Sequence, residues 1–286
     1  MKLLRYGEAG KEKPACLDDA GCMRDLSHHI PDLAGEILSP TYLAELQKIK
    51  IETLPIIENN SRIGPCIHQV GKFICIGLNY PDHAKETNAD IPTEPVVFLK
   101  ATSSICGPYD HTIIPHHSTH TDWEVELGII IGKSAKRVSI EHALDYIAGY
   151  CVVNDVTERH YQRHNTTQWA KGKSCDTFGP IGPWLVTPDE MTDIHHLALW
   201  LEVDGKRYQN GNTQHMIFKV PYLISYLSQF FTLYPGDIIS TGTPAGIGCA
   251  QKPNAIFLKP GQQVTLGITG LGKQQHHMIA EEVPKK

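Results

Sequence analysis

The sequence predicts a mainly β fold of the α+β class, built as a sandwich or a barrel. After residue 70 most apolar runs are short and separated by Gly or Pro, and helical periodicity is limited to a few places. A doubly wound α/β sheet would need a crossover helix after most strands, and the pattern does not offer one. The chain has 286 residues, 41% of them hydrophobic and 20% charged, which is enough apolar material for a large core.

The first 70 residues differ in texture from the rest, and we predict a small N-terminal domain over residues 1–70. Residues 3–6 predict a strand, and a turn-rich stretch follows it. Ser39 is a candidate N-cap, and Pro40 fits the first turn of a short helix that ends near Leu46. A Gly-Pro turn at residues 64–65 then leads into a second domain, predicted over residues 71–286.

The second domain is predicted from alternating or continuous apolar runs. Its predicted strands span residues 73–77, 96–100, 125–131, 147–153, 197–203, 237–241 and 263–268. Helical spacing is confined to residues 83–86, 140–146 and 221–231, of which the last is the clearest.

Charge and cysteine usage exclude several classes of protein. The formal net charge is −5 and no long basic run occurs, so we expect neither a nucleic-acid nor an anionic-membrane partner. The eight cysteines form no C-x-x-C pair, which argues against zinc knuckles and thioredoxin-like motifs. With neither a signal-like apolar segment near residue 1 nor an apolar run long enough to span a bilayer, we expect a cytoplasmic protein.

Three carboxylates form the most informative pattern. Glu124 and Glu126 share one face of a predicted strand, because side chains alternate along a strand. For an isolated E-x-E pair a solvated strand face is the commoner explanation. Here the strand continues into an apolar run that predicts burial, and Asp155 emerges where a second apolar strand ends. Three carboxylates without histidine or thiol suit Mg²⁺, Mn²⁺ or Ca²⁺ better than zinc. Spacing alone leaves both explanations open.

An ordered series of motifs over residues 71–272 resembles the fumarylacetoacetate hydrolase superfamily. The series consists of GLNYPDHAKE at residues 77–86, FLK at 98–100, WEVELG at 123–128, GY at 149–150, NDVT at 154–157, KGKS at 171–174, DTFGP at 176–180 and TGTP at 241–244. Within the superfamily the chain resembles the bacterial branch labelled ureidoglycolate lyase or 2,4-diketo-3-deoxy-L-fuconate hydrolase.

The resemblance implies a mixed β-sandwich roll preceded by a small N-terminal domain, and commonly a homodimer. It also implies that Glu124, Glu126 and Asp155 are metal ligands, with Mg²⁺ or Mn²⁺ as the cofactor and Ca²⁺ as a further option. One position departs from the acylpyruvase members, which often carry Arg where this chain has Leu78. That departure weakens any transfer of an acylpyruvate preference.

By the same resemblance, four residues are catalytic. His83 and Glu86 are three apart and so share a face of a helical turn, where the carboxylate raises the basicity of the imidazole. From sequence alone a surface histidine beside a helix-terminal glutamate is the commoner explanation. Lys173 aligns with the lysine that stabilises enolate charge, although lysines in loops are usually solvated. Gln162 matches a position that orients water or substrate.

Three further residues are candidates for binding substrate. Thr243 lies in a Gly-containing turn whose hydroxyl and backbone N–H groups can bind an anion, although an ordinary turn explains it too. Arg159 is a candidate on family position. Lys100 closes an apolar strand, where lysines usually reach out to solvent.

These parts predict the hydrolysis of a C–C bond in a small 2,4-dioxo acid, of the diketo sugar acid or acylpyruvate type, with release of pyruvate. The 2-oxo acid chelates the metal through its keto oxygen and carboxylate, a water activated by the His83–Glu86 pair attacks the distal carbonyl, and the metal and Lys173 stabilise the enolate. A ureidoglycolate lyase, or an isomerase or decarboxylase of 2-hydroxy-dienedioates, would use the same scaffold. A noncatalytic metal-stabilised binding protein is the alternative from a different class.

Overall fold

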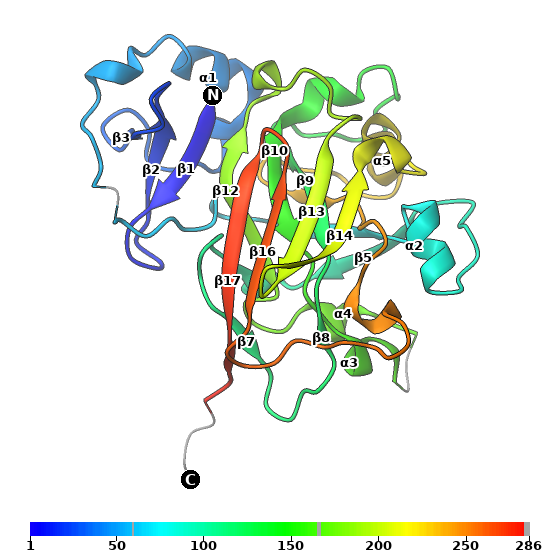
Figure 1. The fold of residues 1–286 in the computed structure, drawn as a ribbon. Coiled ribbons are helices and arrows are strands. Elements are labelled where there is room, and N and C mark those ends of the chain that lie inside the picture. The colour runs from blue at the N-terminus through cyan, green and yellow to red at the C-terminus, as the bar shows by residue number, and fades with distance from the viewer. Residues whose placement is uncertain (59, 165–166, 283–286) are drawn as a thin grey trace.

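In a computed structural model, which describes residues 1–58, 60–164 and 167–282, two β-sheets pack face to face. The larger sheet follows the order β3 (Met23–Asp25), β2 (Lys13–Leu17), β1 (Lys2–Tyr6), β12 (Gly179–Val186), β10 (Ile147–Asn154), β9 (Val125–Ile131), β15 (Ile238–Ser240), β4 (Phe73–Gly77) and β5 (Val96–Lys100), and β6 (Ile105–Cys106) pairs with β12. The smaller sheet follows the order β14 (Lys206–Asn212), β13 (Ala198–Val203), β16 (Gln263–Ile268), β17 (Gly272–Ala280) and β7 (Thr112–Ile114). Figure 1 shows the smaller sheet in front of β9, β10 and β12.

Both sheets are mixed, since most neighbouring strands are antiparallel while β4 with β15, β6 with β12 and β7 with β17 are parallel. A short ribbon of β8 (Thr121–Asp122) and β11 (Thr157–Glu158) stands apart from the two sheets. The predicted mixed β-sandwich with a small N-terminal sheet region is confirmed.

Within the described residues, five α-helices lie around the sandwich: α1 (Pro40–Leu46), α2 (Pro81–Glu86), α3 (Arg159–Arg163), α4 (Ala170–Lys173) and α5 (Val220–Phe230). Helix α1 begins as the sequence predicts, because the Ser39 hydroxyl accepts a hydrogen bond from the Tyr42 N–H at 3.2 Å and Pro40 occupies the first turn. In Figure 1, α2, α3 and α4 lie on the same side of the molecule. None of the helices in the described ranges combines the length and apolarity that crossing a bilayer requires.

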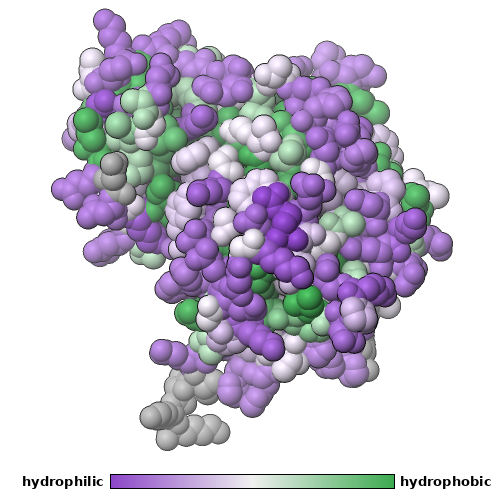
Figure 2. Space-filling model, in the orientation of Figure 1, coloured by the Kyte–Doolittle hydropathy of each residue, from purple (hydrophilic) through white to green (hydrophobic). Residues whose placement is uncertain are grey.

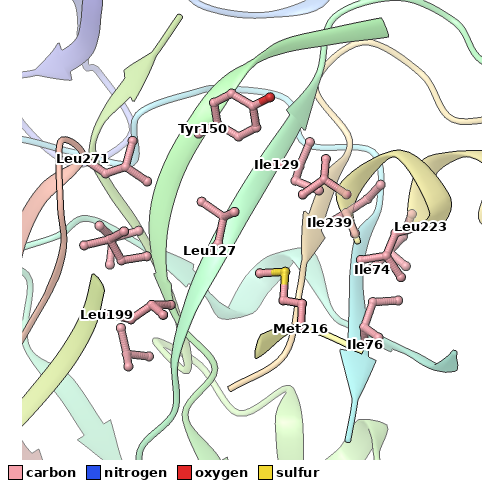
Figure 3. Close-up of a cluster of buried hydrophobic side chains, with 14 of the residues drawn as sticks. Ile74, Ile76, Leu127, Ile129, Tyr150, Leu199, Met216, Leu223, Ile239 and Leu271 are labelled. Atoms are coloured by element: carbon pink, nitrogen blue, oxygen red, sulfur yellow. The ribbon is translucent and has the colours of Figure 1, made fainter. Parts of the chain in front are cut away.

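The principal core lies between the two sheets and beneath α5. Leu127 and Ile129 of β9 face Leu199 of β13, and all three side chains are fully buried. Figure 3 shows this cluster, with Leu223 of α5 at its edge. Since alternate residues of β9 fill this core, Glu126 and Ile130 point to the opposite face of the sheet.

The N-terminal strands extend the large sheet, because β1 pairs with β12. The backbone hydrogen bonds of the sheet therefore continue from the N-terminal region into the second region. Figure 1 places these strands to one side of the sandwich. The boundary between residues 70 and 71 stays a prediction, as does the extent of the second domain, whose last four residues lie outside the described part of the chain. On the face shown in Figure 2 hydrophilic side chains predominate, and hydrophobic ones form separate small patches.

The sequence prediction fails for some elements. The helix predicted at residues 140–146 is wrong, since only a 3₁₀ turn forms, at Ala143–Tyr146. Three long strands were missed: β12 contains two prolines, while β14 and β17 are mostly polar. Such strands lack the apolar alternation on which the prediction depends, and only their cross-strand partners fix them.

Candidate metal centre and active-site cavity

Three carboxylates converge where β9 and β10 lie side by side. One oxygen each from Glu124, Glu126 and Asp155 lies within 4.8 Å of the others, and all three residues are buried. The antiparallel register pairs Asn154 with Val125, so the end of β10 brings Asp155 beside the beginning of β9. The explanation of a solvated strand face is therefore wrong for this pair of glutamates.

Three buried cations surround these carboxylates. Lys173 Nζ donates to Glu124 Oε2 at 2.7 Å and to Asp155 Oδ2 at 2.6 Å, while Lys100 Nζ donates to Asp155 Oδ1 at 2.6 Å. Arg159 Nη2 donates to Glu124 Oε1 at 2.7 Å. Ion pairs of this kind offset the cost of burying several like charges together.

Glu126 is held by the polypeptide backbone and a hydroxyl. Its Oε2 accepts hydrogen bonds from Ser240 Oγ at 2.6 Å and from the Gly242 N–H at 2.9 Å. Gly242 has φ +95°, and a Cβ there would lie 2.7 Å from Asn79 Cβ. Only glycine fits this turn, which fixes the direction of its N–H toward the carboxylate.

The charge balance differs between the two glutamates. Burial and the carboxylates of Asp155 and Glu124 raise the pKa of Glu126 well above its usual range. Burial acts in the same direction on Glu124, but the Lys173 and Arg159 cations outweigh it and hold the pKa of Glu124 well below its usual range. For Lys173, burial favours the neutral amine, but Asp155 and Glu124 raise its pKa above the ordinary value. A divalent cation among these oxygens would relieve the repulsion at Glu126, and an all-oxygen ligand set fits Mg²⁺, Mn²⁺ or Ca²⁺.

An imidazole and a carboxylate lie on α2, close to this cluster. His83 Nδ1 is 2.9 Å from Glu86 Oε1, and Glu86 Oε2 accepts the Gly246 N–H at 2.8 Å. His83 is 6% exposed, so it is not the surface histidine that the commoner explanation supposes. Pro81 occupies the first turn of α2, and Leu78, just before it, has φ 55°. The contact between His83 Nδ1 and Glu86 Oε1 fixes the imidazole ring, and it leaves His83 Nε2 available for proton transfer.

Glu124, Glu126 and His83 line one cavity of about 370 Å³, a volume typical of small-molecule sites, while Asp155 lies outside its described lining. Its described lining consists of Ile76, Gly77, Leu78, His83, Thr87, Ala89, Phe98, Glu124, Glu126, Arg159, Gln162, Arg163, Trp169, Lys173 and Thr243. One wall of the cavity is aromatic. There the rings of Phe98 and Trp169 pack edge to face, with their centroids 5.3 Å apart. The cavity therefore combines a charged floor with an apolar wall.

The remaining predicted residues differ in how they meet the cavity. Gln162 lines it and accepts a hydrogen bond from Arg159 Nη1 at 3.2 Å. The Thr243 hydroxyl donates to Val125 O at 2.9 Å and accepts from Gln209 Nε2 at 2.7 Å, so it is already engaged with the protein. Lys100 is 3% exposed and lies behind Asp155, outside the described lining. It does not reach solvent, and its nearest charged partner is the carboxylate.

Sequence reasoning missed several residues that hold the site together. Asn79 donates to the carbonyl oxygens of Thr241 (2.7 Å) and Phe218 (3.1 Å), which ties the start of α2 to the turn after β15. Gln209 accepts the Val125 N–H at 2.9 Å and donates to Thr243. Asp122 binds Arg159 Nε at 2.8 Å. No local pattern marks these side chains, although a polar residue next to the E-x-E strand was a usable signal for Asp122.

The chain is similar to known proteins over most of its length. The family model described as fumarylacetoacetate (FAA) hydrolase C-terminal matches residues 72–279. A Burkholderia orbicola protein described as a hydrolase, with no substrate stated, is 61% identical over 274 residues, which cover 96% of this chain and 97% of that protein. The structure of a fumarylacetoacetate hydrolase from Exiguobacterium antarcticum aligns with a TM-score of 0.84 and 32% identity, covering 98% of this chain and all of the other.

A maleylpyruvate hydrolase from Sphingobium sp. SYK-6, determined with manganese(II) and pyruvate, shares the fold, with a TM-score of 0.82. It is 24% identical, and the alignment covers 99% of this chain and all of that one.

Proposed function

Because the chain belongs to the fumarylacetoacetate hydrolase family, we propose that it is a divalent-metal-dependent hydrolase of small 2,4-dioxo acids that releases pyruvate. We include diketo sugar acids and acylpyruvates in this class, in keeping with the sequence resemblance to the 2,4-diketo-3-deoxy-L-fuconate hydrolase branch. The observation that carries the proposal is the convergence of three buried carboxylates with Lys173 and the His83–Glu86 pair around one cavity.

Glu124, Glu126 and Asp155 are the residues that would hold the cation, with Mg²⁺ or Mn²⁺ as the expected ion. When bound, such an ion polarises the 2-oxo group of the substrate. The Sphingobium maleylpyruvate hydrolase, whose fold matches, was determined with manganese(II) and pyruvate, which supports this choice of ion and product.

The chain's own groups account for the proton transfers. Glu86 fixes His83 through Nδ1, and His83 Nε2 takes a proton from water as the hydroxide adds to the distal carbonyl carbon. Collapse of the tetrahedral adduct breaks the bond between C3 and C4 and expels the enolate of pyruvate, and the distal fragment leaves as a carboxylic acid. The Lys173 ammonium balances the enolate charge, and the proton that His83 took from water passes to C3, which completes pyruvate and returns His83 to its starting state.

The cavity walls serve binding. Arg159 and Gln162 present polar groups toward the space above Glu124, where a substrate carboxylate can be recognised. Phe98 and Trp169 exclude water from the planar dioxo segment.

Replacing Glu126→Gln tests the assignment. The variant removes one anionic ligand while keeping the shape, so it should lose Mn²⁺ binding in calorimetry and pyruvate release in a coupled assay together. Glu202→Gln on β13, where the glutamate pairs with Arg207 at the surface, is the matched control and should keep both properties. Turnover that survives Glu126→Gln would refute the metal site.

The substrate panel separates the alternatives. Pyruvate release from 2,4-dioxo acids supports the hydrolase, whereas urea release from ureidoglycolate would establish the lyase instead. Inactivity on every acid of the panel with saturating Mg²⁺ and Mn²⁺ would contradict the proposal and favour a noncatalytic binding protein.

A further inference from the structure

Asp122 is a buried carboxylate that lies beside the cavity without lining it. It ends β8 and is 0% exposed. Its Oδ1 accepts the N–H groups of Trp123 (2.8 Å) and Gly248 (2.6 Å). Its Oδ2 accepts the Cys249 N–H at 2.9 Å and Arg159 Nε at 2.8 Å. Four donors satisfy the lone pairs of this carboxylate, so it is a fixed anchor and not a free ligand.

On one side, this anchor sets the orientation of Arg159. The guanidinium is planar, and its Nε edge points at Asp122 while Nη2 and Nη1 point at Glu124 and Gln162. Because the group is rigid, holding the Nε edge determines where the other two nitrogens lie. The partners of those two nitrogens, Glu124 and Gln162, line the cavity. Asp122 itself does not line it.

On the other side, the anchor holds the backbone segment that supports the α2 pair. Gly248 approaches so closely that a Cβ would lie 2.6 Å from Asp122 Oδ1. Two residues earlier, the Gly246 N–H binds Glu86 Oε2 at 2.8 Å. Asp122 therefore connects, through hydrogen bonds on its two oxygens, the arginine of the cavity and the segment that fixes Glu86.

We propose that Asp122 is a positioning residue of the active site, acting through Arg159 and without touching substrate. Asp122 holds the guanidinium in the orientation in which it binds a carboxylate above Glu124. It also fixes the position of the guanidinium relative to His83 and Glu86 on α2. The ligand class rests on the proposed function, but the role of Asp122 follows from its own contacts.

Oxalate binding to the Mg²⁺-saturated full-length chain provides the test. Asp122→Asn should weaken the oxalate Kd measured by calorimetry by about tenfold or more, since an amide presents N–H groups toward Arg159 and Cys249. In an Arg159→Ala background the same change should alter the Kd less than about twofold, because the residue through which it acts is gone. Equal weakening in both backgrounds, or an unchanged Kd in the single variant, would overturn the proposal.

Asp110→Asn is the matched control. Asp110 also binds an arginine through both oxygens, at 2.7 and 2.6 Å from Arg62, but away from the cavity lining. It should lower the melting temperature without changing the oxalate Kd. Loss of oxalate affinity in this control as large as in Asp122→Asn would show a general effect of destabilisation and count against the proposal.

A measurement on the unmodified protein covers the case in which Asp122→Asn does not fold or oxalate does not bind. The Arg159 Nε–H, identified in nitrogen NMR spectra by its loss in Arg159→Lys, should exchange slowly with solvent because Asp122 holds it in a buried site. Rapid exchange would contradict the proposed anchoring. Neither readout needs turnover, so an inactive substrate panel would refute the hydrolase proposal and leave the role of Asp122 standing.

Discussion

The substitution Gly172→Ala should disturb the active site by displacing the two helices, α3 and α4, that carry several of its residues. Gly172 lies in α4, where it packs against the backbone of α3. An added Cβ would lie 2.4 Å from Gln162 N, 2.6 Å from Glu158 O and 2.7 Å from Gln162 Cα. All three are backbone atoms, so no flexible side chain can move aside.

The size of the effect follows from these distances. Ordinary Cβ contacts begin near 3.4 Å, so α3 and α4 must separate by about 1 Å to admit the methyl group. Helix α3 carries Arg159 and Gln162, and α4 carries Lys173, so the shift separates groups that must act on one ligand. A misplacement of this size costs about 100-fold in turnover, and the strain should destabilise the fold by about 1–3 kcal/mol.

Two assays check this prediction: oxalate affinity of the Mg²⁺-loaded protein, and the rate of pyruvate release from an active 2,4-dioxo acid. Gly205→Ala is the control. Gly205 has φ +78°, and no heavy atom lies within 4 Å of a Cβ added there. That change should cost about 1 kcal/mol of stability through backbone strain and leave both assays unchanged. A Gly172→Ala variant with wild-type oxalate affinity and turnover would refute the reasoning.

Two further predictions concern stability. Ile129→Ala should lower the free energy of unfolding by about 2–5 kcal/mol in denaturant titrations, because the side chain is fully buried between the sheets; a loss below about 1 kcal/mol would contradict that packing. Asp110→Asn should flatten the acid limb of the stability curve. Although burial acts in the opposite direction, hydrogen bonds from Arg62 hold the pKa of Asp110 below its ordinary value of 3.8. The unfolded chain therefore takes up the proton first, and the stability present above pH 3.8 is lost as the pH falls through the lower folded-state pKa. An unchanged acid limb in the variant would contradict this linkage.

The sequence by itself determined the parts of the protein that depend on local pattern. Alternation of side chains along residues 124–127 placed Glu124 and Glu126 on one face, opposite Val125 and Leu127, and the structure confirms this. The strand ending at Asn154 predicted where Asp155 would emerge. These features are local because the two-residue period of a strand and its end are properties of consecutive residues. The strands at residues 73–77, 96–100, 125–131 and 263–268 were predicted with their observed bounds for the same reason.

The tertiary structure alone decided which residues orient those carboxylates and cations. Asp122 and Arg159 are 37 residues apart, and Glu126 and Ser240 are 114 apart, yet each pair shares a hydrogen bond. It also decided that polar strands such as β14 and β17 belong to the second sheet. Hydrogen-bond partners across such distances depend on how whole strands pair and pack. Propensities and periodicities of neighbouring residues contain no information about that pairing.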